Sequence, residues 1–340
     1  MLSKKEQSIL KLIPKARSDN DPNNPEFPAD DPKFPATPTY PIKVPSFSDV
    51  WLKDESYNPT GTHKDRMAWE LVCQYRHFLE MKQRGLMTGA LPRFSMISSG
   101  NAALAVSTAF KKYNLPKLKI LVDIHTKPHI VEFLKQNHSE VYFTDLSIKK
   151  LDFKDILRLT RNPNGFDVTS NDGLDRTTIF YDWLSFEIIN NDPDYVLCPF
   201  GTGELYENIC NVLKRESQKV KDYDPRLKIS PKRLGWINII GATSNRADTA
   251  ADKIYAPHLP FTHFNEQWLG FYRNLGYIGQ QSGVFVVQER YIEKAYDYLT
   301  QLGIRCEPSG AAGLGYLLEH PERLPKRKRI VIVNTGRGLY

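Results

Sequence analysis

The sequence contains few cysteines, and they do not form the pattern of a metal site or a disulfide scaffold. Only four occur among 340 residues, at Cys73, Cys198, Cys210 and Cys306. There is no CxxC pair and no cysteine–histidine spacing typical of zinc. We therefore expect no metal ligands, no disulfide framework and a reducing, cytoplasmic location.

Long apolar runs are also missing. No segment approaches the ~20 apolar residues that cross a membrane, and the first ten residues lack the apolar core of a signal peptide. The apolar content of 41% and charged content of 25% are ordinary for a globular protein. These features predict a soluble chain with no membrane partner, long enough for one large core or two medium ones.

Acidic residues are outnumbered, which gives a net charge of +7. The one dense basic run, Lys326–Arg329, directly precedes the apolar segment Ile330–Val333. A basic patch can bind nucleic acid, but a position just before a strand favours a solvated loop. We expect no nucleic-acid partner, whereas a mildly positive surface suits anionic small molecules.

Internal repeats are absent, and short apolar runs alternate with longer amphipathic stretches. The predicted strands are 119–124, 141–144, 195–199, 236–240, 284–288 and 330–334. The predicted helices are 65–84, 101–113, 128–137, 176–190, 204–216, 290–302 and 309–319. Such alternation predicts parallel βαβ units and an α/β fold. Strand groups at 95–170 and 195–335 predict two open αβα domains with mostly parallel sheets and a cleft between them.

The most informative segment is residues 53–66, Lys-Asp-Glu-Ser-Tyr-Asn-Pro-Thr-Gly-Thr-His-Lys-Asp-Arg. Lys64 follows a turn at Asn58–Gly61, and apolar periodicity from Met67 onward predicts a helix with Thr62 as a plausible N-cap. The free N–H groups of a first helical turn create a positive potential that lowers the pKa of an ammonium. A lysine with a lowered pKa suits Schiff-base chemistry.

Two loops have the form of anion sites. Ser98–Ala102 precedes a predicted helix with small residues that expose N–H groups and hydroxyls. Gly201–Leu205 follows the predicted strand 195–199 and opens a helix, which is the form of a phosphate cradle. It lacks the Gly-Lys-Ser/Thr of a nucleoside-triphosphate loop. The carboxylate of Glu204 must point away from a phosphate or be compensated.

Residues 53–66, both loops and the C-terminal segment Val333–Gly338 resemble the motifs of fold-type-II pyridoxal-phosphate (PLP) enzymes, the tryptophan-synthase-β-like superfamily. The run at 53–66 looks most like threonine synthase. His63 instead resembles tryptophan synthase β, because most threonine synthases have Phe at this position. The resemblance extends from residue 53 to residue 338 and leaves a proline-rich N-terminal arm unexplained.

The resemblance implies a role for each motif. Lys64 would hold PLP as an internal aldimine and act as the catalytic base and acid. Thr335 would bond the pyridine nitrogen, with Ser309 of the family-like segment 307–312 as the next candidate. The implied cofactor-binding residues are Lys64, Asn101, Gly201, Thr202, Gly203, Glu204, Leu205 and Thr335. The implied substrate-binding residues are Ser98, Ser99, Gly100 and Asn101.

The resemblance also implies an organisation and an activity. It predicts an N-terminal arm at 1–45, a large PLP-binding domain at 46–75 and 176–340, and a smaller mobile domain at 76–175. A cytoplasmic homodimer acting on an amino acid is expected. Threonine-synthase-like γ-replacement is the first choice, followed by ammonia-lyase or cysteine-synthase-like chemistry. The alternative is an inactive scaffold that serves as a binding or regulatory module, suggested by His63 and Glu204.

Overall fold

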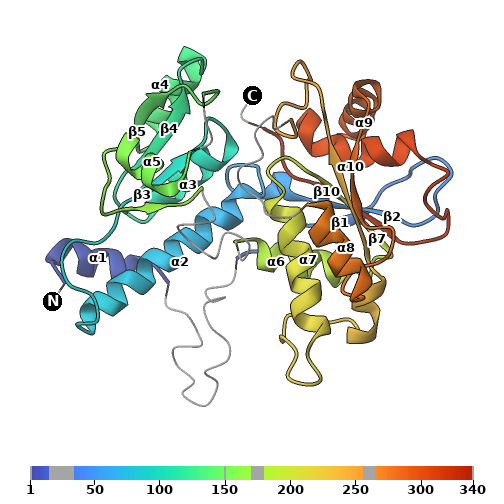
Figure 1. Ribbon diagram of the computed structural model, residues 1–340, viewed down its shortest axis with the longest axis horizontal. Helices are drawn as coiled ribbons and strands as arrows, with labels where there is room; N and C mark the ends of the chain where they lie inside the picture. The colour runs from blue at the N-terminus through green and yellow to red at the C-terminus, as the bar shows by residue number, and fades with distance from the viewer. Residues whose placement is uncertain (1, 15–33, 149–150, 170–179, 256–264, 339–340) are drawn as a thin grey trace. The chain divides into compact units, whose positions relative to one another are not determined.

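The chain forms two compact α/β units in the computed structural model, which describes residues 2–14, 34–148, 151–169, 180–255 and 265–338 (Figure 1). Unit 1 comprises Met1–Pro35 and Lys64–Thr177, and unit 2 comprises Ala36–His63 and Thr178–Tyr340. The first division falls inside the predicted range 46–75, because the long helix that begins at Lys64 packs within unit 1. Mobility of the smaller unit stays a prediction.

Unit 2 is built on a six-stranded sheet with strand order β1-β2-β10-β7-β8-β9. Its strands are β1 Thr39–Pro41, β2 Val50–Asp54, β7 Tyr195–Pro199, β8 Asn238–Thr243, β9 Gly283–Val286 and β10 Ile330–Asn334. All neighbours are parallel except β1, which runs antiparallel to β2 at the edge. Its helices are α6 Asp182–Ile189, α7 Glu204–Ser217, α8 Glu266–Asn274, α9 Glu289–Gln301 and α10 Pro308–Glu319, with 3-10 turns η2 Glu55–Tyr57 and η4 Pro231–Trp236.

Unit 1 contains a four-stranded parallel sheet with order β5-β4-β3-β6. Its strands are β3 Phe94–Ile97, β4 Leu118–Asp123, β5 Ser139–Thr144 and β6 Phe166–Asp167. Its helices are α1 Lys4–Leu12, α2 Lys64–Gln83, α3 Asn101–Lys112, α4 Pro128–Gln136 and α5 Phe153–Leu159. The prediction of an α/β fold with mostly parallel sheets is confirmed.

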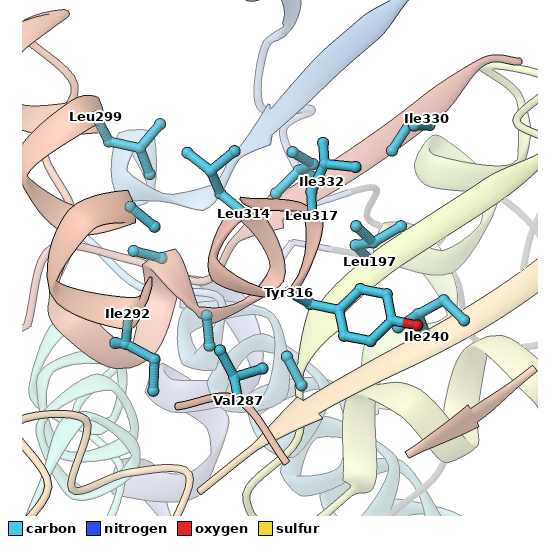
Figure 2. Close-up of a cluster of buried hydrophobic side chains, with 14 of the residues drawn as sticks. Leu197, Ile240, Val287, Ile292, Leu299, Leu314, Tyr316, Leu317, Ile330 and Ile332 are labelled. Carbon is cyan, nitrogen blue, oxygen red and sulfur yellow. The ribbon is translucent and has the colours of Figure 1, made fainter. Parts of the chain in front are cut away.

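The core of unit 2 explains why its central strands are continuous apolar runs. Leu197, Ile240 and Ile332 lie on three neighbouring strands and are almost wholly buried. Figure 2 shows Ile332 next to Leu314 and Leu317 of α10, and Ile240 next to Tyr316 of the same helix. Since burying such a side chain contributes about 1.5–3 kcal/mol, this interface fixes the strands whose ends form the candidate site.

Two parts of the predicted N-terminal arm have regular structure that the sequence did not lead us to assign. Helix α1 begins after Ser3, whose hydroxyl oxygen accepts from the N–H of Glu6 while the Glu6 side chain accepts from the N–H of Ser3. Strand β1 pairs with β2, and Pro41 is tolerated there because β1 is an edge strand. The part of the arm at 15–33 lies outside the described residues.

Candidate active site

The carboxyl ends of the parallel strands in unit 2 bring several predicted residues to one edge of the sheet. Asn334 of β10 pairs with Asp54 of β2, and Ile332 pairs with Leu197 of β7. Thr335 and the loop at 200–203 therefore leave from neighbouring strand ends. In open α/β sheets this edge is where ligands bind.

The turn after β7 has the geometry of an anion cradle. Gly203 is the N-cap of the 14-residue helix α7 and adopts φ +86°, a left-handed conformation that favours glycine. Since Gly203 has no side chain that could cap this helix end, the first N–H groups and the dipole of α7 suit a phosphate. A Cβ on Gly201 would lie 2.1 Å from the carbonyl oxygen of Lys253, so the start of the turn also requires glycine.

Glu204 is the one residue of this loop whose charge opposes a phosphate. It is the first residue of α7, and only 9% of it is exposed. A carboxylate at a helix N-terminus is stabilised by the helix dipole. Thr202, which offers a hydroxyl, is half-buried, and Leu205 is buried. The loop fits a phosphate if the Glu204 carboxylate turns away from it.

Lys64 is the first residue of α2, which agrees with its predicted place in the first turn. The residue directly before the helix is His63, so the prediction of Thr62 as N-cap is wrong; Thr62 instead forms an isolated bridge with Gly336. The turn before Lys64 is held at both ends. The N–H of Gly61 donates to the carbonyl oxygen of Asn58 at 2.8 Å, and the Asn58 amide donates to the Glu55 carboxylate at 2.8 Å. Glu55 and Asn58 are both buried, so the turn is fixed from inside the protein.

The segment that leads into Lys64 is hydrogen-bonded to the end of β10. The N–H of His63 donates to the carbonyl oxygen of Thr335 at 2.9 Å, and the N–H of Arg337 donates to that of Gly61 at 2.9 Å. A Cβ on Gly336 would lie 2.5 Å from the Gly61 oxygen, so only glycine allows this approach. The residue before Lys64 is thereby fixed against Thr335, of which 6% is exposed.

His63 contributes a second contact to the same carbonyl. Its Nδ1 lies 3.1 Å from the Thr335 oxygen, and its ring centroid lies 5.2 Å from that of Tyr181. Because a carbonyl oxygen only accepts, Nδ1 carries the hydrogen in this contact. The sequence marked His63 as a departure from threonine synthases but gave no sign of this pairing, which joins residues 272 positions apart.

Buried polar side chains form hydrogen bonds around the ends of β2 and β10. The sequence alone indicates no role for these side chains. The Asp54 carboxylate accepts from the Asn334 amide at 2.9 Å and from the Tyr40 hydroxyl at 2.7 Å. Burial, together with the neighbouring Asp54 carboxylate, raises the pKa of the Tyr40 phenol. Lys53 Nζ donates to the Glu187 carboxylate at 2.5 Å. This network fixes Asn334, the residue before Thr335.

The predicted substrate loop lies in unit 1, between β3 and α3. Gly100 is the N-cap of α3 and Asn101 its first residue. The Ser98 hydroxyl oxygen accepts from the N–H groups of Gly100 and Ala103, at 3.3 Å each. Ser98 therefore caps the helix, while Ser99 is exposed. Because a hydroxyl that accepts can still donate its own hydrogen, the hydroxyls of Ser98 and Ser99 suit a carboxylate.

The donor set fits PLP group by group. The start of α7 after Gly203 would suit the phosphate, the Thr335 hydroxyl would suit the ring nitrogen, and Lys64 would supply a primary amine for the aldehyde. Ser309, the other candidate for the ring nitrogen, uses its hydroxyl oxygen to accept from the N–H of Lys253 at 3.1 Å. In the described ranges no cluster of three or more His, Cys, Asp or Glu could hold a metal ion, and no helix there has the length and hydropathy of a membrane span.

Several solved structures share the fold of this chain. No curated protein sequence matches the chain. A diaminopropionate ammonia lyase from Escherichia coli, solved with D-serine, superposes with a TM-score of 0.62 at 15% identity, over 98% of this chain and 89% of that one. A hydrogen sulfide-producing enzyme from Fusobacterium nucleatum gives 0.59 at 19% identity over 98% of both chains.

A cysteine synthase from Entamoeba histolytica also gives a TM-score of 0.59, at 15% identity, over 96% of this chain and 86% of that one. Identities this low show a shared fold. The sequence profile of the family described as pyridoxal-phosphate dependent enzyme matches residues 34–336. That match includes all the strands of both sheets and leaves out only the chain ends. The protein therefore belongs to the pyridoxal-phosphate dependent enzymes, and its fold is that of the type-II members.

Proposed function

We propose that this protein is a PLP-dependent lyase or β/γ-replacement enzyme that acts on an amino acid, with Lys64 as its cofactor-binding and proton-transferring residue. The observation that carries this proposal is the position of Lys64, which opens α2 directly after a residue bonded to the Thr335 carbonyl. Thr335 in turn follows β10, which is the strand next to β7, and the loop after β7 has the form of a phosphate cradle.

Each proposed role follows from the chemistry of the residue. Bound PLP supplies an electron sink for negative charge at the substrate Cα. The Lys64 amine takes up and returns the Cα proton. The N–H groups at the start of α7 bind the phosphate, and the Thr335 hydroxyl orients the ring without protonating its nitrogen. Asn101 contacts the ring oxygen, and the Ser98–Gly100 loop binds the substrate carboxylate.

For the substrate, we propose an amino acid with a leaving group on its β- or γ-carbon. The run at 53–66 favours threonine-synthase-like γ-replacement. Ammonia-lyase or cysteine-synthase-like chemistry is the second choice, and the ammonia lyase and cysteine synthase of the same fold support it. A hydroxyl rather than a carboxylate at residue 335 favours elimination and replacement over transamination, because it leaves the ring nitrogen unprotonated.

A non-catalytic scaffold is the second candidate function, and Glu204 favours it. A buried carboxylate at the first position of α7 weakens the attraction of that helix end for a phosphate dianion. A chain that had lost PLP would keep the fold and the polar network while tolerating such a residue.

We also propose that the protein is a cytoplasmic homodimer. The four cysteines are free thiols, which agrees with a reducing compartment. Trp268, Phe271 and Leu275 are each between 45% and 49% exposed along one stretch of α8 and its end, and such apolar residues suit a subunit interface. Light scattering coupled to size exclusion should give twice the chain mass.

Borohydride trapping tests the cofactor role directly. The purified protein is incubated with PLP, reduced and mapped by peptide mass spectrometry. We expect the pyridoxyl group on Lys64, and none in a Lys64→Ala variant. Lys53 serves as an internal control, because it is buried and ion-paired. Label on another lysine, or no label at saturating PLP, would refute the assignment of Lys64.

An amino-acid panel with product mass spectrometry then separates enzyme from scaffold. Turnover of any member of the panel by the PLP-loaded protein, and its loss in Lys64→Ala, would support catalysis. Failure to bind PLP, or binding of PLP without turnover of serine, threonine, cysteine, diaminopropionate or O-activated homoserine, would favour the scaffold. The products also distinguish hydrolysis of the intermediate from replacement by a nucleophile.

A further inference from the structure

A pocket lies in unit 2 at the amino ends of the parallel strands, at the other end of the sheet from the proposed cofactor residues of this unit. It is lined by the first residues of two strands, Tyr195 of β7 and Asn238 of β8, and by Gln280 and Gln281 just before β9. The proposed cofactor residues of this unit follow the carboxyl ends of the strands, whereas this pocket lies at their amino ends. Its volume of about 580 Å³ is typical of small-molecule sites.

The floor of the pocket is held by main-chain and amide hydrogen bonds. The N–H of Gly279 donates to the carbonyl oxygen of Ile237 at 2.8 Å, and the N–H of Gln281 donates to the Asn238 side-chain oxygen at 2.8 Å. A Cβ on Gly279 would lie 2.3 Å from that oxygen, so the loop can approach only as glycine. The pocket is therefore preformed.

Two neighbouring amides in the lining have one end occupied by the protein and the other end available. The Gln281 oxygen accepts from the Tyr195 hydroxyl at 2.7 Å, which leaves its NH₂ group as a donor. The Gln280 nitrogen donates to the Arg273 carbonyl oxygen at 2.8 Å, which leaves its oxygen as an acceptor. The lining thus offers one amide donor and one amide acceptor, and a ligand that carries both an acceptor and a donor, as a nucleobase does, can pair with them.

Two other lining residues supply an aromatic surface and a positive charge. Trp236, the last residue of η4, is 72% exposed and offers an indole face on which a planar ring can stack. Lys232 lies four residues earlier on the same turn and is exposed. Among the described residues that line the pocket there is no Asp or Glu, so the lining favours an anion.

We infer that this pocket binds a planar heterocycle that carries an anionic group, for which a nucleoside monophosphate is the smallest probe with all the required parts. The base stacks on Trp236 and pairs its edge with Gln280 and Gln281. The phosphate pairs with Lys232. This ligand is separate from PLP, and its binding does not depend on the proposed reaction.

The test is a calorimetric titration of the PLP-loaded protein with AMP, GMP, CMP and UMP. We expect at least one to bind with a Kd below ~1 mM, which corresponds to about −4 kcal/mol. Trp236→Ala should weaken that binding by ~10-fold or more, as expected from the loss of base stacking. Phe143→Ala removes another exposed aromatic side chain, on β5 of unit 1 and outside the pocket, and is the control.

Fragments of the ligand separate the base from the phosphate. Lys232→Met should weaken the nucleotide but leave the corresponding nucleoside unchanged, whereas Lys326→Met, outside the pocket, should change neither. Lys64→Ala should bind the nucleotide as wild type does. The inference is overturned if no monophosphate binds at ~1 mM, if Trp236→Ala binds normally, or if PLP competes with the nucleotide. Competition would place the nucleotide in the cofactor site.

Discussion

Gly203 must adopt a left-handed backbone conformation, and it lies where we propose that the negatively charged phosphate binds. Two substitutions separate the effect of conformation from the effect of charge. At φ +86° any L side chain is strained, at a cost of about 1–2 kcal/mol. Gly203→Ala introduces the strain alone, and Gly203→Asp adds a negative charge beside the proposed phosphate. We expect a moderate loss of PLP affinity for Ala and a loss well over ~10-fold for Asp, measured by titration of PLP absorbance.

The comparison of the two Gly203 variants decides how the loop acts. If both lose the same affinity while they remain folded by circular dichroism, geometry rather than charge governs binding. If neither loses affinity, the phosphate binds elsewhere in the protein.

Thr335 tests the proposed partner of the ring nitrogen. Thr335→Ser keeps the hydroxyl and should leave the absorption spectrum of bound PLP nearly unchanged. Thr335→Asp places a carboxylate beside the ring nitrogen and favours its protonation. We expect a changed spectrum and a shift of products away from elimination or replacement. Product ratios and spectra are measured at equal PLP content.

A structural role alone would give a different result for Thr335. Its carbonyl oxygen already accepts from the His63 N–H, and both variants retain that main-chain bond. A Thr335→Asp protein with normal PLP content, spectrum and products would therefore show that the side chain does not face the ring. Ser309→Ala would then be the next variant.

At the residue scale, features that depend on neighbouring residues in the sequence are predictable, whereas contacts between residues far apart in the sequence are not. Lys64 at the start of a helix follows from the Asn58–Gly61 turn and the apolar periodicity after it, which act over a few residues. The bonds from His63 to Thr335 depend on how β2 and β10 pair in the sheet. No local pattern encodes such a pairing.

At the scale of elements, strands with uninterrupted apolar runs were predicted best. The observed β7 and β10 coincide with the predicted ranges 195–199 and 330–334. Strand β2 was missed because it contains Lys53 and Asp54, which break the apolar pattern. Both are almost wholly buried, and their charges are satisfied by partners far away in the sequence.

The buried Lys53–Glu187 pair joins β2 to α6, and its removal should destabilise unit 2. Lys53→Met removes the cation that lies 2.5 Å from Glu187 and 4.0 Å from Glu55, both largely buried. Removing one partner of a buried pair typically costs about 3–5 kcal/mol. We expect a lower urea midpoint of unfolding for the PLP-free protein, followed by circular dichroism.

A double variant and a surface pair provide the controls for Lys53. Lys53→Met/Glu187→Gln removes both charges of the pair, so it should recover part of the lost stability. Arg246→Met breaks the exposed pair with Asp248 and should leave the midpoint nearly unchanged. Equal midpoints for Lys53→Met and wild type would mean that the ion pair makes no net contribution.

At the scale of the whole molecule, the alternation of strands and helices was sufficient to predict two parallel sheets. The predicted strand groups at 95–170 and 195–335 correspond to the sheets of unit 1 and unit 2, except that β1 and β2 join the second sheet from before residue 95. The chain enters unit 2, leaves it at His63 and returns at Thr178. Local periodicity cannot reveal such a discontinuous unit.

Cofactor binding should stabilise the folded chain as a whole, because PLP binds the native state and not the unfolded chain. At a ligand concentration of ~100 Kd this linkage adds about 2.7 kcal/mol to the free energy of unfolding. We expect PLP to raise the thermal midpoint of wild type and to raise that of Lys64→Ala less, since the variant cannot form the covalent link. Calorimetry at fixed protein concentration measures both.

Two PLP analogues show which part of the cofactor supplies the thermal shift. Pyridoxine 5'-phosphate has no aldehyde, so its smaller shift should be the same in wild type and Lys64→Ala. Pyridoxal has no phosphate, so its shift should be insensitive to Gly203→Asp, whereas that variant should largely abolish the shift with pyridoxine 5'-phosphate. If PLP shifts Lys64→Ala as much as wild type, the covalent link contributes nothing measurable, and the phosphate cradle alone holds the cofactor.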